Sequence, residues 1–164
     1  MEQKYIYSFS QIEDKVKALH ETNTEAAAAV ALSWLGLSRD ELKTLRVSDY
    51  NSTMRMLHSA GRVVYVREDL IADMLKAICE EAPEYSMGFF ITDVNSAYEA
   101  AEKQELSPIS VLKMRYFYEK HSAKLSGEPE DRVFLKEILR SVGESEVDME
   151  KQFAEYEKNA PEKI

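Results

Sequence analysis

Apolar residues recur at helical spacing along most of the chain, which predicts a mainly helical fold. Ile12, Val16 and Leu19 share one face of a first helix. Ser10 and Glu13 have the spacing of a capping box, in which the side chain of each residue accepts a hydrogen bond from the backbone N–H of the other. We therefore expect this helix to begin at Ser10.

The segment 24–35 is apolar on nearly every side, so we expect a buried helix there, ended by Gly36. Ser38 and Glu41 repeat the capping-box spacing and predict a short helix immediately afterwards. A buried helix, a glycine corner and a second helix thus follow one another closely.

The pattern favours strands in only one part of the chain. The segments 54–58 and 62–66 flank Ser59-Ala60-Gly61 and predict a β-hairpin. The apolar run 88–91 is either a brief strand or a buried connector. The remaining segments predict five helices, at about 68–80, 92–104, 107–125, a segment ending near 142, and 145–158. Thr92 is expected to cap the second of these, Pro108 lies in the first turn of the third, and Gly143 ends the fourth. The predicted fold class is mainly α (α+β), with one small antiparallel β-sheet.

Length and charge limit the classes of function. The 164 residues suit one domain, expected to span 1–164, and carry a formal charge of -9. That acidity disfavours a protein that mainly coats phosphates or docks on an anionic membrane. The lone Cys79 cannot form an intramolecular disulfide, which fits a reducing compartment, and no apolar run has the length of a membrane span. We expect a soluble, cytoplasmic protein without a membrane partner.

The chain lacks a pattern for metal or cofactor chemistry. His20, His58 and His121 are scattered, and Cys79 lies on an apolar helix face as a structural thiol would. The acidic run 144–150 lacks the glycine and ligand positions of a calcium loop, which favours a solvated helix start. We therefore expect neither a metal nor a cofactor.

One motif carries a resemblance to a known family. Gly36-Leu37-x-x-x-Glu41-Leu42-x-x-Leu45-x-x-x-Asp49 lies between the buried helix and the hairpin. With the order of elements over about 5–158, it resembles the catalytic domain of the tyrosine recombinases, or phage integrases. The resemblance implies that family's fold and its chemistry, the transfer of a DNA phosphate to a tyrosine. We expect the family's separate N-terminal core-binding domain to be absent here, because Met1 lies only a few residues before the first predicted helix.

The family's catalytic residues are replaced at every matching position. Two arginines should grip the phosphate, a lysine and histidines should move protons, and a tyrosine should attack. The corresponding positions are Ser38 for the first arginine, Leu57 for the lysine, Ser110 and Lys113 (or, shifted by one, Ile109 and Leu112) for H-x-x-R, Glu144 for the late histidine and Phe153 for the tyrosine. The resemblance therefore implies a degenerate domain without the family's activity.

Some cations remain as candidates for contacting DNA. They are Arg39, Arg55, Arg62, Lys113 and Arg115. The alternative for the hairpin arginines, Arg67 included, is a solvated strand edge that discourages pairing. Tyr116 and Tyr118 either stack bases or belong to an amphipathic helix with extended lysines.

The sequence thus predicts a catalytically inactive, integrase-like protein of mobile-element origin that binds DNA weakly or binds another protein. The alternative is an acidic protein-interaction module that does not bind DNA. An active recombinase with relocated residues, Tyr156 replacing the missing nucleophile, is a third hypothesis. The helix 145–158 is a candidate contact between protomers in a homo-oligomer.

Overall fold

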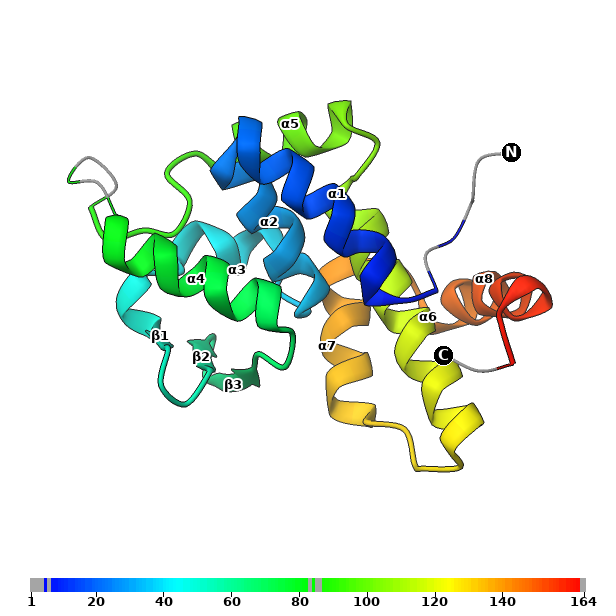
Figure 1. Cartoon of the computed structure of the whole chain (residues 1–164). Coiled ribbons are helices and arrows are strands. Elements are labelled where there is room, and N and C mark those ends of the chain that lie inside the picture. Colours follow the sequence, from blue (N-terminus) through cyan, green and yellow to red (C-terminus); the bar gives the residue numbers. More distant parts are fainter. Residues whose placement is uncertain (1–4, 6, 83, 85–86, 163–164) are drawn as a thin grey trace.

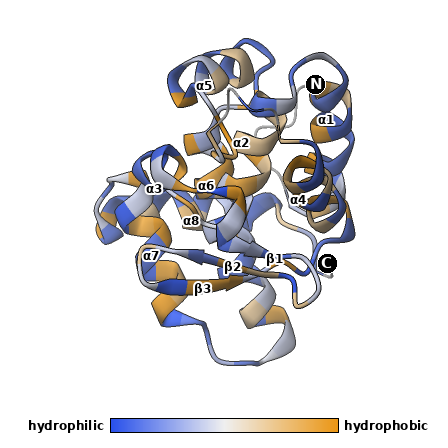
Figure 2. Cartoon of the chain, turned by 90° about the vertical axis from the view of Figure 1, so that its left-hand side faces the viewer, coloured by the Kyte–Doolittle hydropathy of each residue, from blue (hydrophilic) through white to orange (hydrophobic). Residues whose placement is uncertain are grey.

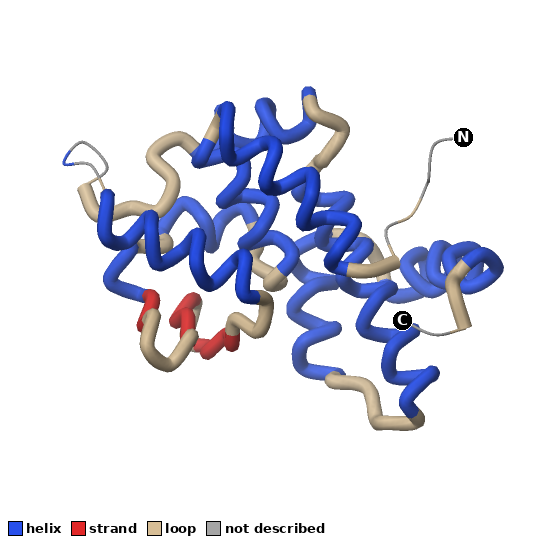
Figure 3. The backbone as a smooth tube through the Cα atoms, viewed as in Figure 1, coloured by secondary structure: helices blue, strands red, loops and turns tan. Residues whose placement is uncertain are grey.

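The fold is mainly helical, as predicted, with one small antiparallel sheet at its lower edge (Figures 1 and 3). The computed structural model describes residues 5, 7–82, 84 and 87–162. The elements, in chain order, are α1 (Phe9–Thr22), α2 (Thr24–Trp34), α3 (Arg39–Thr44), the 3-10 helix η1 (Val47–Asp49), β1 (Tyr50–Asn51), β2 (Met56–Ser59), β3 (Arg62–Tyr65), α4 (Asp69–Glu81), α5 (Val94–Lys103), α6 (Pro108–Ser126), α7 (Arg132–Val142) and α8 (Glu146–Asn159).

Helix α2 lies at the centre of the larger hydrophobic cluster. Every residue from Ala26 to Trp34 is buried, as the apolar pattern predicted. Helices α1, α4, α5 and α6 pack around it, and Figure 2 shows its apolar ribbon inside the shell of helices. Its alanines keep the helix narrow, so the neighbouring helices can approach closely.

A second hydrophobic cluster joins α6, α7 and α8. Helix α6 connects the two clusters, because Val111 belongs to the first and Leu112 to the second. Figure 1 shows these three helices grouped on one side of α2. The last helix is held by Met149, Phe153 and Tyr156, the buried residues of its inner face.

The sheet has the order β1-β2-β3, so β3 lies at one edge. The hairpin is confirmed, with Leu57 opposite Val64 and Ser59 opposite Arg62. Its two-residue turn, Ala60-Gly61, has positive φ angles at both positions (50° and 77°), as a type I′ turn requires. The two-residue strand β1 was not predicted, because it is too short to show an alternating pattern.

Two predicted helix caps were wrong. Helix α1 begins at Phe9 after Ser8, whose backbone N–H donates to the side chain of Gln11, so the cap lies before the predicted Ser10. Helix α5 is capped by Asp93 in place of Thr92, because the Asp93 carboxylate accepts from a backbone N–H in the first turn.

Other expectations held. The starts at Ser38 and Ser107-Pro108 and the glycine cap at Gly143 are confirmed. The run 88–91 is a connector with a single bridge, between Phe89 and Arg46. These outcomes reflect local chemistry that the sequence displays directly.

Candidate functional site

The motif that begins at Gly36 forms a tight corner between α2 and α3. Gly36 has a φ of +95°, and a Cβ there would lie 2.7 Å from a ring carbon of Phe134 on α7. The Ser38 hydroxyl accepts from the N–H of Glu41 at 3.2 Å, and the Glu41 carboxylate accepts from the N–H of Ser38 at 3.1 Å. The position of the expected first arginine thus holds a helix cap.

Glu41 also ties this corner to the hairpin. A guanidinium nitrogen of Arg62 lies 2.9 Å from one Glu41 oxygen, and the Ser59 hydroxyl donates to the other at 2.8 Å. Burial alone would raise the pKa of Glu41, but its hydrogen bonds, led by that from Arg62, lower the pKa below its ordinary value. Arg62, a candidate for DNA contact, is therefore held by an internal carboxylate.

The position of the expected hairpin lysine holds a core residue. Leu57 on β2 is fully buried and belongs to the larger hydrophobic cluster. An aliphatic side chain cannot donate a proton, so this position contributes packing only.

Two of the other matching positions contact each other. The ammonium nitrogen of Lys113 on α6 lies 2.7 Å from a carboxylate oxygen of Glu144, in the turn between α7 and α8. Gln152 donates to the second oxygen of Glu144 at 2.8 Å. The hydrogen bond from Lys113 holds the pKa of Glu144 below its ordinary value. Glu144 is thus an ion-pair partner rather than part of a solvated helix start, while Ser110, one turn earlier on α6, is exposed.

The position of the expected nucleophile is filled by a buried ring. Phe153 packs against Phe117 and Tyr156 in the second cluster, with the ammonium groups of Lys120 and Lys124 each 5.4 Å from its ring centre. Tyr156 is fully buried, and its hydroxyl has no hydrogen-bond partner among the described residues. Burial raises the pKa of Tyr156, which disfavours the phenolate that a relocated nucleophile would need.

Arg115 is enclosed within the fold. Its guanidinium donates to Glu119 at 2.7 Å and to the backbone oxygen of Trp34 at 2.6 Å. It also lies over the rings of Trp34 and Phe134, at 5.0 and 4.8 Å from their centres. This candidate for DNA contact therefore joins α6 to α2 and α7.

Arg39 and Arg55 lie nearer the surface. Arg39 hydrogen-bonds Asn95 and lies 4.8 Å above the centre of the Tyr98 ring, so it joins α3 to α5. Arg55 pairs with Asp69 at 2.8 Å, and both side chains of that pair are exposed. All five cations proposed to contact DNA therefore have partners within the chain.

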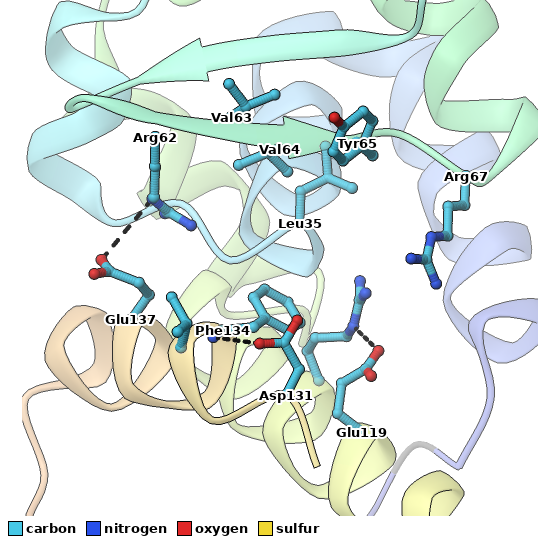
Figure 4. Close-up of a pocket in the computed structure, with 12 residues that line it drawn as sticks. Leu35, Arg62, Val63, Val64, Tyr65, Arg67, Glu119, Asp131, Phe134 and Glu137 are labelled. Atoms are coloured by element: carbon cyan, nitrogen blue, oxygen red, sulfur yellow. Dashed lines mark hydrogen bonds and ion pairs between the residues drawn. The ribbon is translucent and has the colours of Figure 1, made fainter. Parts of the chain in front are cut away.

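A groove lies beside β3, and Figure 4 shows it between that strand and the first turns of α7. Its volume is about 220 Å³. It is lined by Leu35, Arg62, Val63, Val64, Tyr65, Arg67, Arg115, Glu119, Asp131, Val133, Phe134 and Glu137, and we call it the β3 groove. Sequence reasoning missed it, because α7 follows the hairpin by about seventy residues and no local pattern links them.

Arg67 differs from the other cations of the β3 groove. Arg62 and Arg115 have carboxylate partners, whereas Arg67 has no ion-pair or hydrogen-bond partner within the described part of the chain. Its exposed side chain points toward the groove in Figure 4. Arg67 is thus the one cation of the groove without a carboxylate partner among the described residues, although three carboxylates, those of Glu119, Asp131 and Glu137, also line it.

The predicted site residues do not form one cluster. Ser38 and Arg62 meet through Glu41, and Lys113 meets Glu144, whereas Leu57 and Phe153 lie in different hydrophobic clusters. Comparison with known proteins finds no matching family model, no similar curated protein and no similar solved structure. Within the described ranges, no group of three metal-binding side chains occurs, and no helix has the length and apolar character to cross a membrane.

Proposed function

We propose that this chain is a catalytically inactive domain of the tyrosine recombinase type, derived from a mobile element, that acts by binding another protein. The Lys113–Glu144 pair carries the proposal. In an active site of that type, cations face the phosphate with free donors. Here Lys113, at the position of the family's second arginine, already donates to the carboxylate of Glu144, and that carboxylate would repel an incoming phosphate.

The engagement of the other cations favours protein over DNA as the partner. Affinity for DNA comes largely from free lysine and arginine side chains that replace condensed counterions on the phosphates. Arg62 and Arg115 are only 19% and 13% exposed, and both are neutralised by internal carboxylates. Breaking these internal ion pairs would destabilise the fold, and the free energy of the phosphate contacts would first have to offset that loss.

Weak binding to DNA is the second candidate, and Arg55 is the observation in its favour. The Arg55–Asp69 pair is 41% and 85% exposed, and such pairs contribute little free energy. Arg55 could therefore exchange its carboxylate for a phosphate at small cost.

Two assays test the proposed function. A gel shift at about 50 mM salt, where phosphate contacts are strongest, should show no binding at high micromolar protein. Binding that is lost in the Arg55→Ala variant, whose exposed ion pair contributes little to the fold, would favour the DNA hypothesis instead. Incubation with supercoiled and nicked DNA should yield no covalent adduct. An adduct that disappears in Tyr156→Phe would overturn the assignment as inactive.

A further inference from the structure

The open edge of β3 presents unpaired backbone groups. In an antiparallel hairpin, alternate residues hydrogen-bond the partner strand, and the residues between them point their N–H and C=O groups away. The Val66 N–H donates to the Arg55 oxygen at 2.9 Å, which places the even-numbered residues of this strand on the side facing β2. The N–H and C=O groups of Val63 and Tyr65 therefore point to the open edge.

The side chains at this edge are apolar and exposed. Val63 and Tyr65 are 42% and 61% exposed, and Val133, across the groove on α7, is 76% exposed. Proteins usually protect an open strand edge by keeping it short or with charged residues, prolines or bulges. This strand is short, but it holds no lysine, proline or bulge, and its one charged residue, Arg62, is paired with Glu41 inside the fold. An edge of this kind suits the addition of another strand.

The β3 groove runs along this edge. Four consecutive residues of β3 line it, and since neighbouring strand residues point to opposite faces, the groove follows the strand's edge rather than one face. Its volume of about 220 Å³ is smaller than the roughly 300–1,000 Å³ typical of small-molecule sites. Such a space suits side chains of an extended chain segment more than a cofactor.

The charge of the groove selects the segment's chemistry. Glu41 and Glu137 compensate Arg62, and Glu119 compensates Arg115, so Arg67 is the cation available to a ligand. The third groove carboxylate, Asp131, caps α7 by accepting from the Phe134 N–H at 3.1 Å and has no cation partner among the described residues. A carboxylate on the segment would pair with Arg67 without displacing an internal partner.

We propose that β3 binds an extended segment of a partner protein, which adds a strand at the edge formed by Val63 and Tyr65. An apolar side chain of the segment enters the β3 groove, and a carboxylate pairs with Arg67. This inference rests on the proposed function, because it names the kind of protein partner that the domain would bind. We expect the segment to have alternating apolar and polar residues, one of them acidic.

A second copy of the chain fits this edge less well. The edge strand has four residues, which is short for a stable dimer interface, and each copy carries a charge of -9. Helix α7 also lies opposite the strand (Figure 4), so a single flexible segment can enter where a folded domain would meet α7.

Selection from a displayed library of short random peptides, followed by binding measurements on the purified chain, tests the proposal. Enriched peptides should share the alternating pattern with an acidic residue. Val63→Pro should abolish their binding, since it removes an outward N–H while leaving the hydrogen bonds to β2 intact. The matched Val63→Thr keeps that N–H and should bind within a few-fold of the unaltered chain. Circular dichroism and urea unfolding establish that both variants fold.

The charge contact has its own variants. Arg67→Glu should weaken the selected peptides at least about tenfold, which corresponds to about 1.4 kcal/mol. Lys43→Glu, an equal charge change at an exposed position of α3 outside the groove, should leave their affinity unchanged within a few-fold.

Three outcomes would overturn the strand-addition proposal. The first is a selection that yields no binding peptide. The second is that Val63→Pro leaves the affinity of the selected peptides unchanged. The third is that the chain sediments as a dimer and Val63→Pro dissociates it, which would assign the edge to a second copy. None of these produces a DNA shift or a covalent adduct. The two proposals therefore fail on different measurements.

Discussion

The ammonium group of Lys113 and the carboxylate of Glu144 lie 2.7 Å apart, although 31 residues separate them in the chain. Their side chains are 22% and 33% exposed, so water screens the pair only in part. The contact joins α6 to the turn before α8. It thus has a structural role at the positions where the family resemblance expects phosphate chemistry.

Glu144→Gln should destabilise the fold by about 1 kcal/mol, because a charge-assisted hydrogen bond is replaced by a neutral one. Urea unfolding at neutral pH measures the loss. Glu99→Gln, at an exposed position of α5, is the matched control and should change stability by less than about 0.5 kcal/mol. Equal stability of the Glu144→Gln variant and the unaltered chain would show that this pair does not hold α8.

Glu41→Gln should cost more, about 3 kcal/mol, because it removes the nearer of the two carboxylates that face Arg62 in a largely buried site and leaves only Glu137, at 3.9 Å. Glu41 and Arg62 are only 11% and 19% exposed. Urea unfolding of Glu41→Gln beside Glu144→Gln gives the comparison. A smaller effect at Glu41 than at Glu144 would contradict the role of the Glu41–Arg62 contact in fixing the hairpin.

The Glu41 contact should also make stability depend on pH. The hydrogen bonds of the folded state lower the pKa of Glu41 below its unfolded value of about 4.5. Its contribution is therefore complete above that value and is lost as the pH falls through the folded-state pKa. Unfolding curves at falling pH should show a smaller acid-induced loss in Glu41→Gln than in the unaltered chain. Parallel losses in the two proteins would contradict this assignment.

Gly36→Ala should destabilise the chain by about 3 kcal/mol. The positive φ disfavours alanine, and the added Cβ would meet the Phe134 ring at 2.7 Å. Gly143→Ala separates the two effects, since Gly143 has a similar φ of +81° and no atom within 4 Å of its Cβ position. That control should lose about 1 kcal/mol. Equal losses in thermal unfolding would show that the Phe134 contact adds nothing.

The sequence identified features whose chemistry is local. The Ser38 box, the Ala60-Gly61 turn and the Gly143 cap each depend on residues within a few positions of one another. The cap predicted at Ser10 was wrong for a local reason, because Ser8, two positions earlier, makes the contact with Gln11. The cap predicted at Thr92 was wrong because its N–H and hydroxyl donate to the carboxylate of Glu25, 67 positions earlier, while Asp93 caps the helix.

The partners of the cations were beyond the reach of sequence reasoning. Arg115 donates to Trp34, 81 positions earlier, and Arg62 to Glu41, 21 positions earlier. Such contacts depend on how helices pack, and a single sequence gives no periodicity for them. For the same reason, the sequence could present five cations as candidates for DNA without showing that each has an internal partner.

Phe153→Tyr restores the family's residue type at one position and should still give no covalent adduct with supercoiled DNA. The new hydroxyl would lie in a buried aromatic cluster, and the arginine, lysine and histidine positions would remain Ser38, Leu57 and Glu144. Loss of one preorganised donor costs about 100- to 1,000-fold in rate, and the proposed relationship to the recombinases implies several such losses. Denaturing gel electrophoresis after incubation detects any adduct.

The control for this experiment is Phe153→Leu, which keeps an apolar side chain and no hydroxyl. Both variants should remain folded by circular dichroism, with a loss of about 1–2 kcal/mol for the tyrosine because its hydroxyl is desolvated. An adduct formed by Phe153→Tyr and absent from Phe153→Leu would show that the remaining cations can still position a phosphate. The Lys113–Glu144 pair would then be an exchangeable contact, and the residues present at positions 38, 57 and 144 would not by themselves prevent the reaction.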